Sequence, residues 1–88
     1  MLENIEQLAY RLFLPRQIAV ILELEEVEDF ENRCRVLSTP EAKAYNRGRY
    51  QQMTELRENI IKAAKNGSNP AQEQLLLLLK ESDNDIII

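Results

Sequence analysis

Residues 5–37 contain three short segments in which apolar side chains recur every three or four positions. That spacing places them on one face of an α-helix. The first segment has its apolar face at Ile5, Leu8, Ala9 and Leu12. The second begins at Pro15, which suits the first turn of a helix because a backbone N–H has no partner there. The third has its apolar face at Val27, Phe30, Cys34 and Leu37. Residues 1–37 are therefore predicted to form a three-helix bundle of the helix-turn-helix kind.

A long helix is predicted to follow. Either Thr39 caps it, with Pro40 in the first turn, or Ser38 and Glu41 form a capping box. It should end at Asn66-Gly67, because glycine readily adopts the left-handed conformation that ends helices. Such a helix is about 40 Å long, whereas a compact globule of this chain length is about 30 Å across. We therefore expect the helix to protrude or to pack against another chain.

A last helix is predicted from Asn69-Pro70, with Asn69 as its cap. It contains five consecutive leucines, Leu75 to Leu79, which in a helix point to all sides of the axis. Leu75, Leu78 and Leu79 can face the long helix, which leaves Leu76 and Leu77 for a second subunit. The alternative is a small bundle that buries all five within one chain. Residues 38–81 are accordingly expected to mediate oligomerisation, with interface residues Leu56, Ile60, Leu76 and Leu77.

The tail, residues 82–88, is expected to break the last helix at Ser82-Asp83-Asn84-Asp85. Its final residues, Ile86-Ile87-Ile88, are expected either to be disordered or to add a short strand to the sheet of a partner. The whole chain is thus predicted to be all-α.

The composition excludes several functions. The chain has no histidine and one cysteine, so neither an internal disulfide nor a Cys/His metal site can form. Cys34 occupies an apolar position and is interpreted as core. We find no nucleophile-base arrangement and no phosphate-binding loop, and we expect neither enzymatic activity nor a cofactor. No apolar run approaches ~18 residues, so the sequence predicts a cytoplasmic protein with no membrane partner.

The charge is unevenly distributed along the chain. The net charge is −4, but residues 21–31 contribute −6, and residues 32–50 contribute +4. Glu25, Glu28 and Asp29 lie where a recognition helix would read bases in the major groove. The following basic residues could instead contact phosphates, which dominate affinity for DNA. The predicted DNA-contacting residues are Arg16, Asn32, Arg33, Arg35, Lys43, Arg47 and Arg49.

Two stretches together resemble a known family. IEQLAYRLFLPRQIAVILELEEVEDF is similar to the helix-turn-helix opening of many phage proteins, and AYNRGRYQQMTELRENIIKAAKNGSNPAQEQLLLLL to what often follows it. The combination, over about residues 5–80, resembles small terminase subunits of tailed phages and prophages. The second stretch carries the more specific part of the likeness, at Tyr45, Arg47, Gly48, Arg49, Leu56, Arg57, Ala64, Gly67 and Pro70.

The resemblance implies a DNA-packaging component in a bacterial host cell. Such subunits form oligomers, recognise viral DNA and regulate the large terminase subunit. The sequence departs from the usual helix-turn-helix pattern at Glu23, where a glycine often stands four residues after the small residue, here Ala19. A turn of different shape or length is therefore expected. Two alternatives remain open: a helical interaction or assembly module that does not bind DNA, and a small prophage transcriptional regulator.

Overall fold

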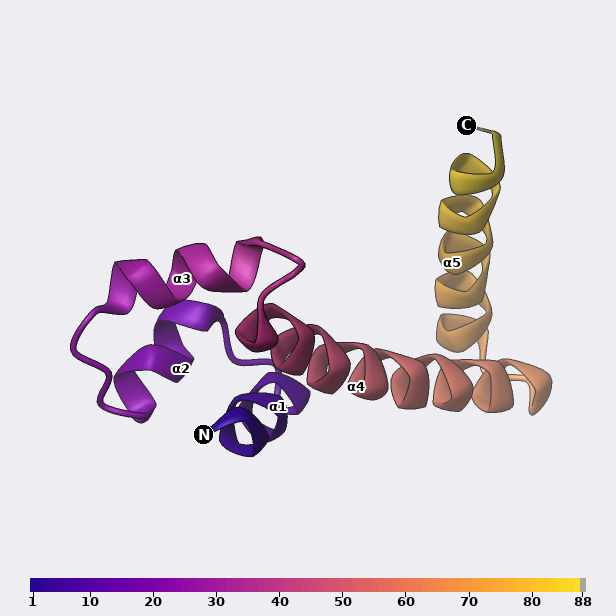
Figure 1. Cartoon of the computed structure of the whole chain (residues 1–88). Helices are drawn as coiled ribbons and strands as arrows, with labels where there is room; N and C mark the ends of the chain where they lie inside the picture. Colours follow the sequence, from indigo (N-terminus) through magenta and orange to yellow (C-terminus); the bar gives the residue numbers. More distant parts are fainter. Residues whose placement is uncertain (88) are drawn as a thin grey trace. The chain divides into compact units, whose positions relative to one another are not determined.

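The structure is a computed structural model that describes the backbone of residues 1–87 and the side chains of residues 1–81. Figure 1 shows its helices in chain order: α1 (Leu2–Tyr10), α2 (Pro15–Ile21), α3 (Val27–Arg35), α4 (Pro40–Lys65) and α5 (Asn69–Ile87). No strand occurs within residues 1–87. The all-α prediction is confirmed.

The chain divides into two compact units, residues 1–53 and residues 54–88, and α4 contributes to both. The first unit thus extends beyond the expected boundary at residue 37. The reason is that the first half of α4 belongs to the core of the N-terminal helices. Buried residues of all four helices form that core: Ile5, Ala9, Ile18, Ala19, Phe30, Cys34, Ala44 and Tyr45.

The apolar spacing predicts most of this core, with errors where α1 and α3 end. Leu12, which follows the end of α1, is 45% exposed and is not part of the core. Val27, Phe30 and Cys34 pack in the core as expected, whereas Leu37 is 73% exposed. The helix ends at Arg35 and the backbone of Val36 is extended. The helical periodicity that would have placed Leu37 on the buried face therefore no longer applies at that residue.

Gly48 marks a close approach between α1 and α4. A Cβ atom added to Gly48 would lie 2.0 Å from the carbonyl oxygen of Glu6 and 3.0 Å from the backbone nitrogen of Tyr10. Both neighbours are backbone atoms, which cannot turn aside as a side chain can. The glycine inside α4 is therefore explained by a close helix crossing.

Three helices end with a residue in the left-handed conformation: Leu12 after α1, Glu23 after α2 and Gly67 after α4. After α2, the N–H of Leu24 donates to the carbonyl of Ala19 over 2.9 Å, and the N–H of Glu23 donates to that of Val20 over 3.1 Å. This is the Schellman hydrogen-bond pattern. Glu23, with φ of 56°, adopts the conformation that a glycine would adopt. Leu22 and Leu24 on either side of it pack against the core and hold this end of α2 without a glycine. Residues 22–26 join α2 to α3, so the expectation of a turn of different shape or length stands.

Replacing Glu23 with glycine is expected to stabilise the first unit by about 1 kcal/mol. A side chain in the left-handed region costs roughly 1–2 kcal/mol, which glycine avoids. The greater flexibility of glycine in the unfolded chain offsets part of that gain. Urea unfolding followed by circular dichroism measures the change. Glu23→Ala, which keeps a Cβ, is the matched control and should leave stability nearly unchanged. Equal stabilisation by the two variants would show that the glutamate side chain, and not the backbone, is the source of the strain.

Local capping residues set the limits of α4. The Thr39 hydroxyl accepts a hydrogen bond from the N–H of Ala42 over 3.1 Å, so Thr39 is the cap of α4, the first of the two predicted arrangements. The same hydroxyl lies 2.6 Å from the carbonyl oxygen of Arg33 and 2.9 Å from that of Val36. One side chain thus ties the end of α3 to the start of α4.

The predicted cap of α5 was misplaced by one residue. Helix α5 begins at Asn69, and the Ser68 hydroxyl accepts from the N–H of Ala71 over 3.4 Å, so Ser68 rather than Asn69 provides the cap.

The second unit pairs the end of α4 with α5. Ala64 and Ala71 are buried between them, and the side-chain amide of Gln72 donates to the carbonyl of Ala64 over 3.1 Å. Arg57 and Glu81 approach to 3.7 Å. Helix α5 continues to Ile87, so the predicted break at Ser82–Asp85 was wrong. Those residue types are only moderately unfavourable in a helix, at up to ~0.7 kcal/mol each. The predictions for the terminal Ile88 lie outside the described residues.

Candidate nucleic-acid interface

The outer face of α3 carries Glu28, Asn32 and Arg35, which are spaced by four and three residues and so share one side of the helix. All three are exposed. They line a shallow hollow of about 260 Å³ together with Arg16 from α2 and Glu31 from α3. The α2–α3 pair therefore brings together three predicted DNA-contacting residues, Arg16, Asn32 and Arg35.

An ion pair joins the two helices across this hollow. The Nε atom of Arg16 donates to Oε1 of Glu31 over 3.0 Å. The Arg16 side chain is well exposed, so solvent weakens the pair and it adds at most about 1 kcal/mol to stability. Its main consequence is orientation, because it holds the guanidinium of Arg16 against α3.

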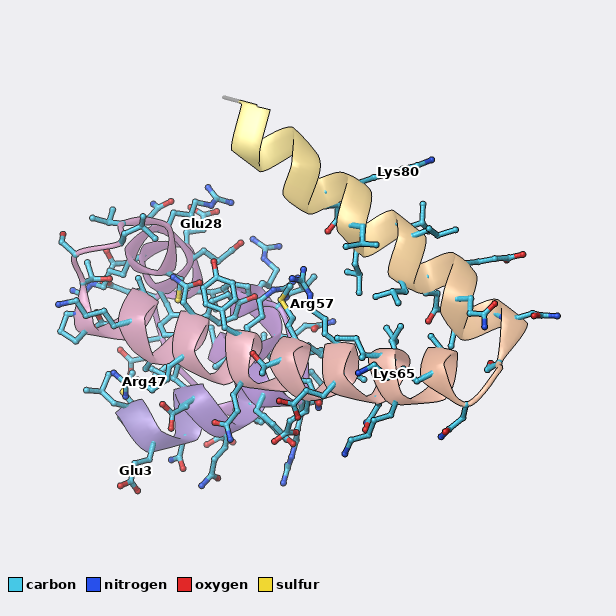
Figure 2. All side chains as sticks on the ribbon, turned by 90° about the vertical axis from the view of Figure 1, so that its right-hand side faces the viewer. Glu3, Glu28, Arg47, Arg57, Lys65 and Lys80 are labelled. Atoms are coloured by element: carbon cyan, nitrogen blue, oxygen red, sulfur yellow. The ribbon has the colours of Figure 1, made fainter. Side chains whose placement is uncertain are left out.

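Two more of the predicted cations are paired with carboxylates. Arg33 lies 3.1 Å from Asp29 on the same helix and 3.6 Å from Glu41 of α4. Arg47 lies 3.1 Å from Glu6 of α1. Figure 2 shows Arg47 on the part of α4 that passes α1. Both arginines link elements of the first unit, so a phosphate would have to compete with a carboxylate for each of them.

The predicted DNA-contacting cations of α4 do not lie along one face of that helix. Lys43 and Arg47 are four residues apart and are neighbours on α4, but Arg49, two residues further on, points to a different side. Arg49 is half-buried, and its Nη1 lies 3.4 Å from the Tyr45 hydroxyl. Of the cations predicted to contact DNA, Arg35 and Lys43 are exposed and form no ion pair within residues 1–81. They are the most available of the predicted phosphate contacts.

A second and larger hollow, which was not predicted from the sequence, lies at the start of α3. It measures about 650 Å³ and is lined by Arg16, Val20, Glu25, Glu26, Val27, Glu28 and Asp29. Val20 of α2 is 64% exposed there. The available signal was the run Ile18–Leu22, in which five consecutive apolar residues cannot all face the core of a short helix.

The predicted interface residues of the second unit fall into two groups. Leu56 and Ile60 line a groove of about 520 Å³ that Pro70 and Ala71 also line. Leu76 and Leu77 are 59% and 60% exposed, as expected if they are not covered within the chain. Leu79 was expected to face α4 but is also largely exposed, whereas Leu75 and Leu78 are half-buried.

Cys34 is a core residue, as predicted. It is buried, and burial raises the pKa of its thiol to about 11, with a smaller contribution from the nearby negative charge of Glu41. The thiol therefore stays protonated at neutral pH and is a poor nucleophile or metal ligand.

The described residues offer few other chemical sites. They contain no group of side chains suited to hold a metal ion, and none of their helices is long and apolar enough to cross a membrane. No protein family model, curated protein or solved structure matches the chain.

Proposed function

We propose that this chain is a non-enzymatic DNA-binding component of phage or prophage DNA packaging, similar to small terminase subunits. In this role it recognises viral DNA, forms an oligomer and regulates a large terminase subunit. The observation that carries the proposal is the α2–turn–α3 pair, in which α3 packs on α2 and presents Asn32 and Arg35 to solvent beside Arg16. In a helix-turn-helix the second helix enters the major groove of DNA, and the packing of α3 on α2 supports such a role for α3.

The charges suggest which part of that surface meets DNA. Glu25, Glu28 and Asp29 at the start of α3 repel phosphates, whereas Arg35 at its end and Lys43 at the start of α4 attract them. Thr39 ties the end of α3 to the start of α4, so these two cations lie on either side of one hydrogen-bonded junction. We therefore place the DNA-contacting surface at this junction, with the exposed Asn32 on the same side of α3 as Arg35.

The test is the salt dependence of binding to a short DNA duplex. Each lost phosphate contact should flatten the slope of log affinity against log salt concentration by about 0.9. Arg35→Ala with Lys43→Ala should therefore weaken binding and reduce the slope by up to about 2. Fluorescence anisotropy of a labelled duplex at several salt concentrations measures both effects.

The matched control is Lys62→Ala with Lys65→Ala, which removes the same charge from the end of α4 in the second unit. This control should change the slope little. Equal effects of the two double variants would mean that the affinity for DNA depends only on the net charge of the protein. The assignment of the interface would then be wrong.

A second candidate is a helical interaction or assembly module that does not bind DNA. It is favoured by the ion pairs of Arg16, Arg33 and Arg47. In these pairs, carboxylates already occupy three of the cations that were predicted to contact DNA. The same experiment separates the two functions, because such a module would not bind the duplex even at low salt.

A further inference from the structure

The hollow at the start of α3 has a floor and a rim of different chemistry. Its apolar residues are Val20, which is mostly exposed, and Val27, which is half-buried and packs on the core. Around them stand the carboxylates of Glu25, Glu26, Glu28 and Asp29. The hollow measures about 650 Å³ and is open to solvent, so side chains of a partner can enter it.

Only part of the negative charge around the hollow is paired with cations. Asp29 is paired with Arg33, and the one cation of the lining, Arg16, is held by Glu31. Within residues 1–81, no ion pair joins Glu25, Glu26 or Glu28 to a cation. Glu28 is exposed on α3 (Figure 2). Three solvated carboxylates therefore surround an uncovered valine.

We infer that this groove, formed by Val20, Val27, Glu25, Glu26 and Glu28, docks a cationic segment of a partner protein, a lysine- or arginine-rich stretch that contains one aliphatic residue. The aliphatic side chain would cover Val20, and the flanking cations would pair with the three glutamates. The inference goes beyond the proposed DNA-binding function and does not depend on it.

Charge and geometry select this occupant over the others. DNA phosphates would be repelled by the same three carboxylates that attract lysine and arginine. The cations of residues 32–50 in a second copy fit less well, because Arg33 and Arg47 are already paired and the others are spread over different sides of two helices. An external segment with unpaired cations meets neither obstacle.

A labelled synthetic peptide, with lysines on both sides of a central leucine, serves as the probe for the full chain. Fluorescence anisotropy should show binding that weakens with salt. Glu25→Gln, Glu26→Gln and Glu28→Gln together should weaken binding about tenfold or more, since each exposed pair is worth up to about 1 kcal/mol. Val20→Ser should weaken it several-fold, and a peptide with serine in place of leucine should reproduce that loss.

The matched control replaces three exposed glutamates outside the groove, Glu3, Glu58 and Glu73, with glutamine. This variant has the same net charge as the groove variant and should bind the peptide nearly as well as the wild type. Circular dichroism confirms that all variants remain helical.

Several outcomes would overturn the inference. Absence of peptide binding to the wild type, equal losses in the groove and control variants, or full binding by Val20→Ser would each show that the groove is not a docking site. A change in oligomeric mass caused only by the groove substitutions would assign the groove to a second copy. Loss of DNA binding caused by them would assign it to DNA.

Discussion

Replacing Gly48 with alanine is expected to destabilise the first unit by about 3 kcal/mol or more, a large part of the stability of a small domain. Helix propensity alone predicts the opposite sign, because alanine in a helix interior is about 1 kcal/mol more favourable than glycine. The crossing of α1 and α4 reverses that expectation. The added Cβ would lie 2.0 Å from the carbonyl oxygen of Glu6, so the two helices must move apart. That movement would strain the ion pair between Arg47 and Glu6 and loosen the packing of Ile5 and Ala9.

Urea unfolding followed by circular dichroism measures the loss. Gln51→Ala is the control, because it adds an alanine at an exposed position of the same stretch of α4 and should change stability by less than about 0.5 kcal/mol. A Gly48→Ala variant more stable than the wild type would show that the two helices do not approach closely at this residue.

The sequence predicted those features that depend on neighbouring residues. The limits of α4 follow from Thr39-Pro40 at one end and Asn66-Gly67 at the other, and the helix indeed occupies Pro40–Lys65. The role of Gly48 could not be decided in the same way. Its reason lies in the backbone of Glu6, 42 positions earlier in the chain, so a bend, a close crossing and simple tolerance all fitted the sequence.

Glu23 illustrates how tertiary contacts override a local preference. Glycine is the residue that the turn after α2 favours, and its absence suggested a different turn. The structure ends α2 with a glutamate in the left-handed conformation that a glycine would adopt. The leucines on both sides of Glu23 pack against the core, and their burial compensates for the strain of one residue.

The candidate interface was predicted least well, because charge was counted along the chain rather than over the folded surface. Arg16 with Glu31 and Arg47 with Glu6 are pairs between residues far apart in sequence, and no local pattern indicates them. The separation of Arg47 from Arg49 was accessible to sequence reasoning, because positions two apart do not share a helix face. Exposed surface charges also have little influence on the fold, so the fold does not reveal their role.

Substituting Leu76 and Leu77 with glutamate is expected to convert the oligomer that we propose into single chains. Fully burying a leucine is worth roughly 1.5–3 kcal/mol, so two leucines from each subunit contribute several kcal/mol to an interface. A glutamate buried at the same place would add the cost of an unpaired charge. Both residues are exposed within the chain, so the substitutions should leave the second unit folded. Leucine and glutamate have similar helix propensities, which also preserves α5.

Light scattering coupled to size-exclusion chromatography measures the mass of wild type and variant at the same micromolar concentration. The control is Lys80→Glu, which changes the net charge by the same −2 at an exposed position of the same helix. Because it leaves the leucines in place, this control should keep the mass of the wild type. If the wild type is itself a single chain at high micromolar concentration, the exposed leucines do not bind a second copy. Of the five leucines, only the half-buried Leu75 and Leu78 would then have a role in packing.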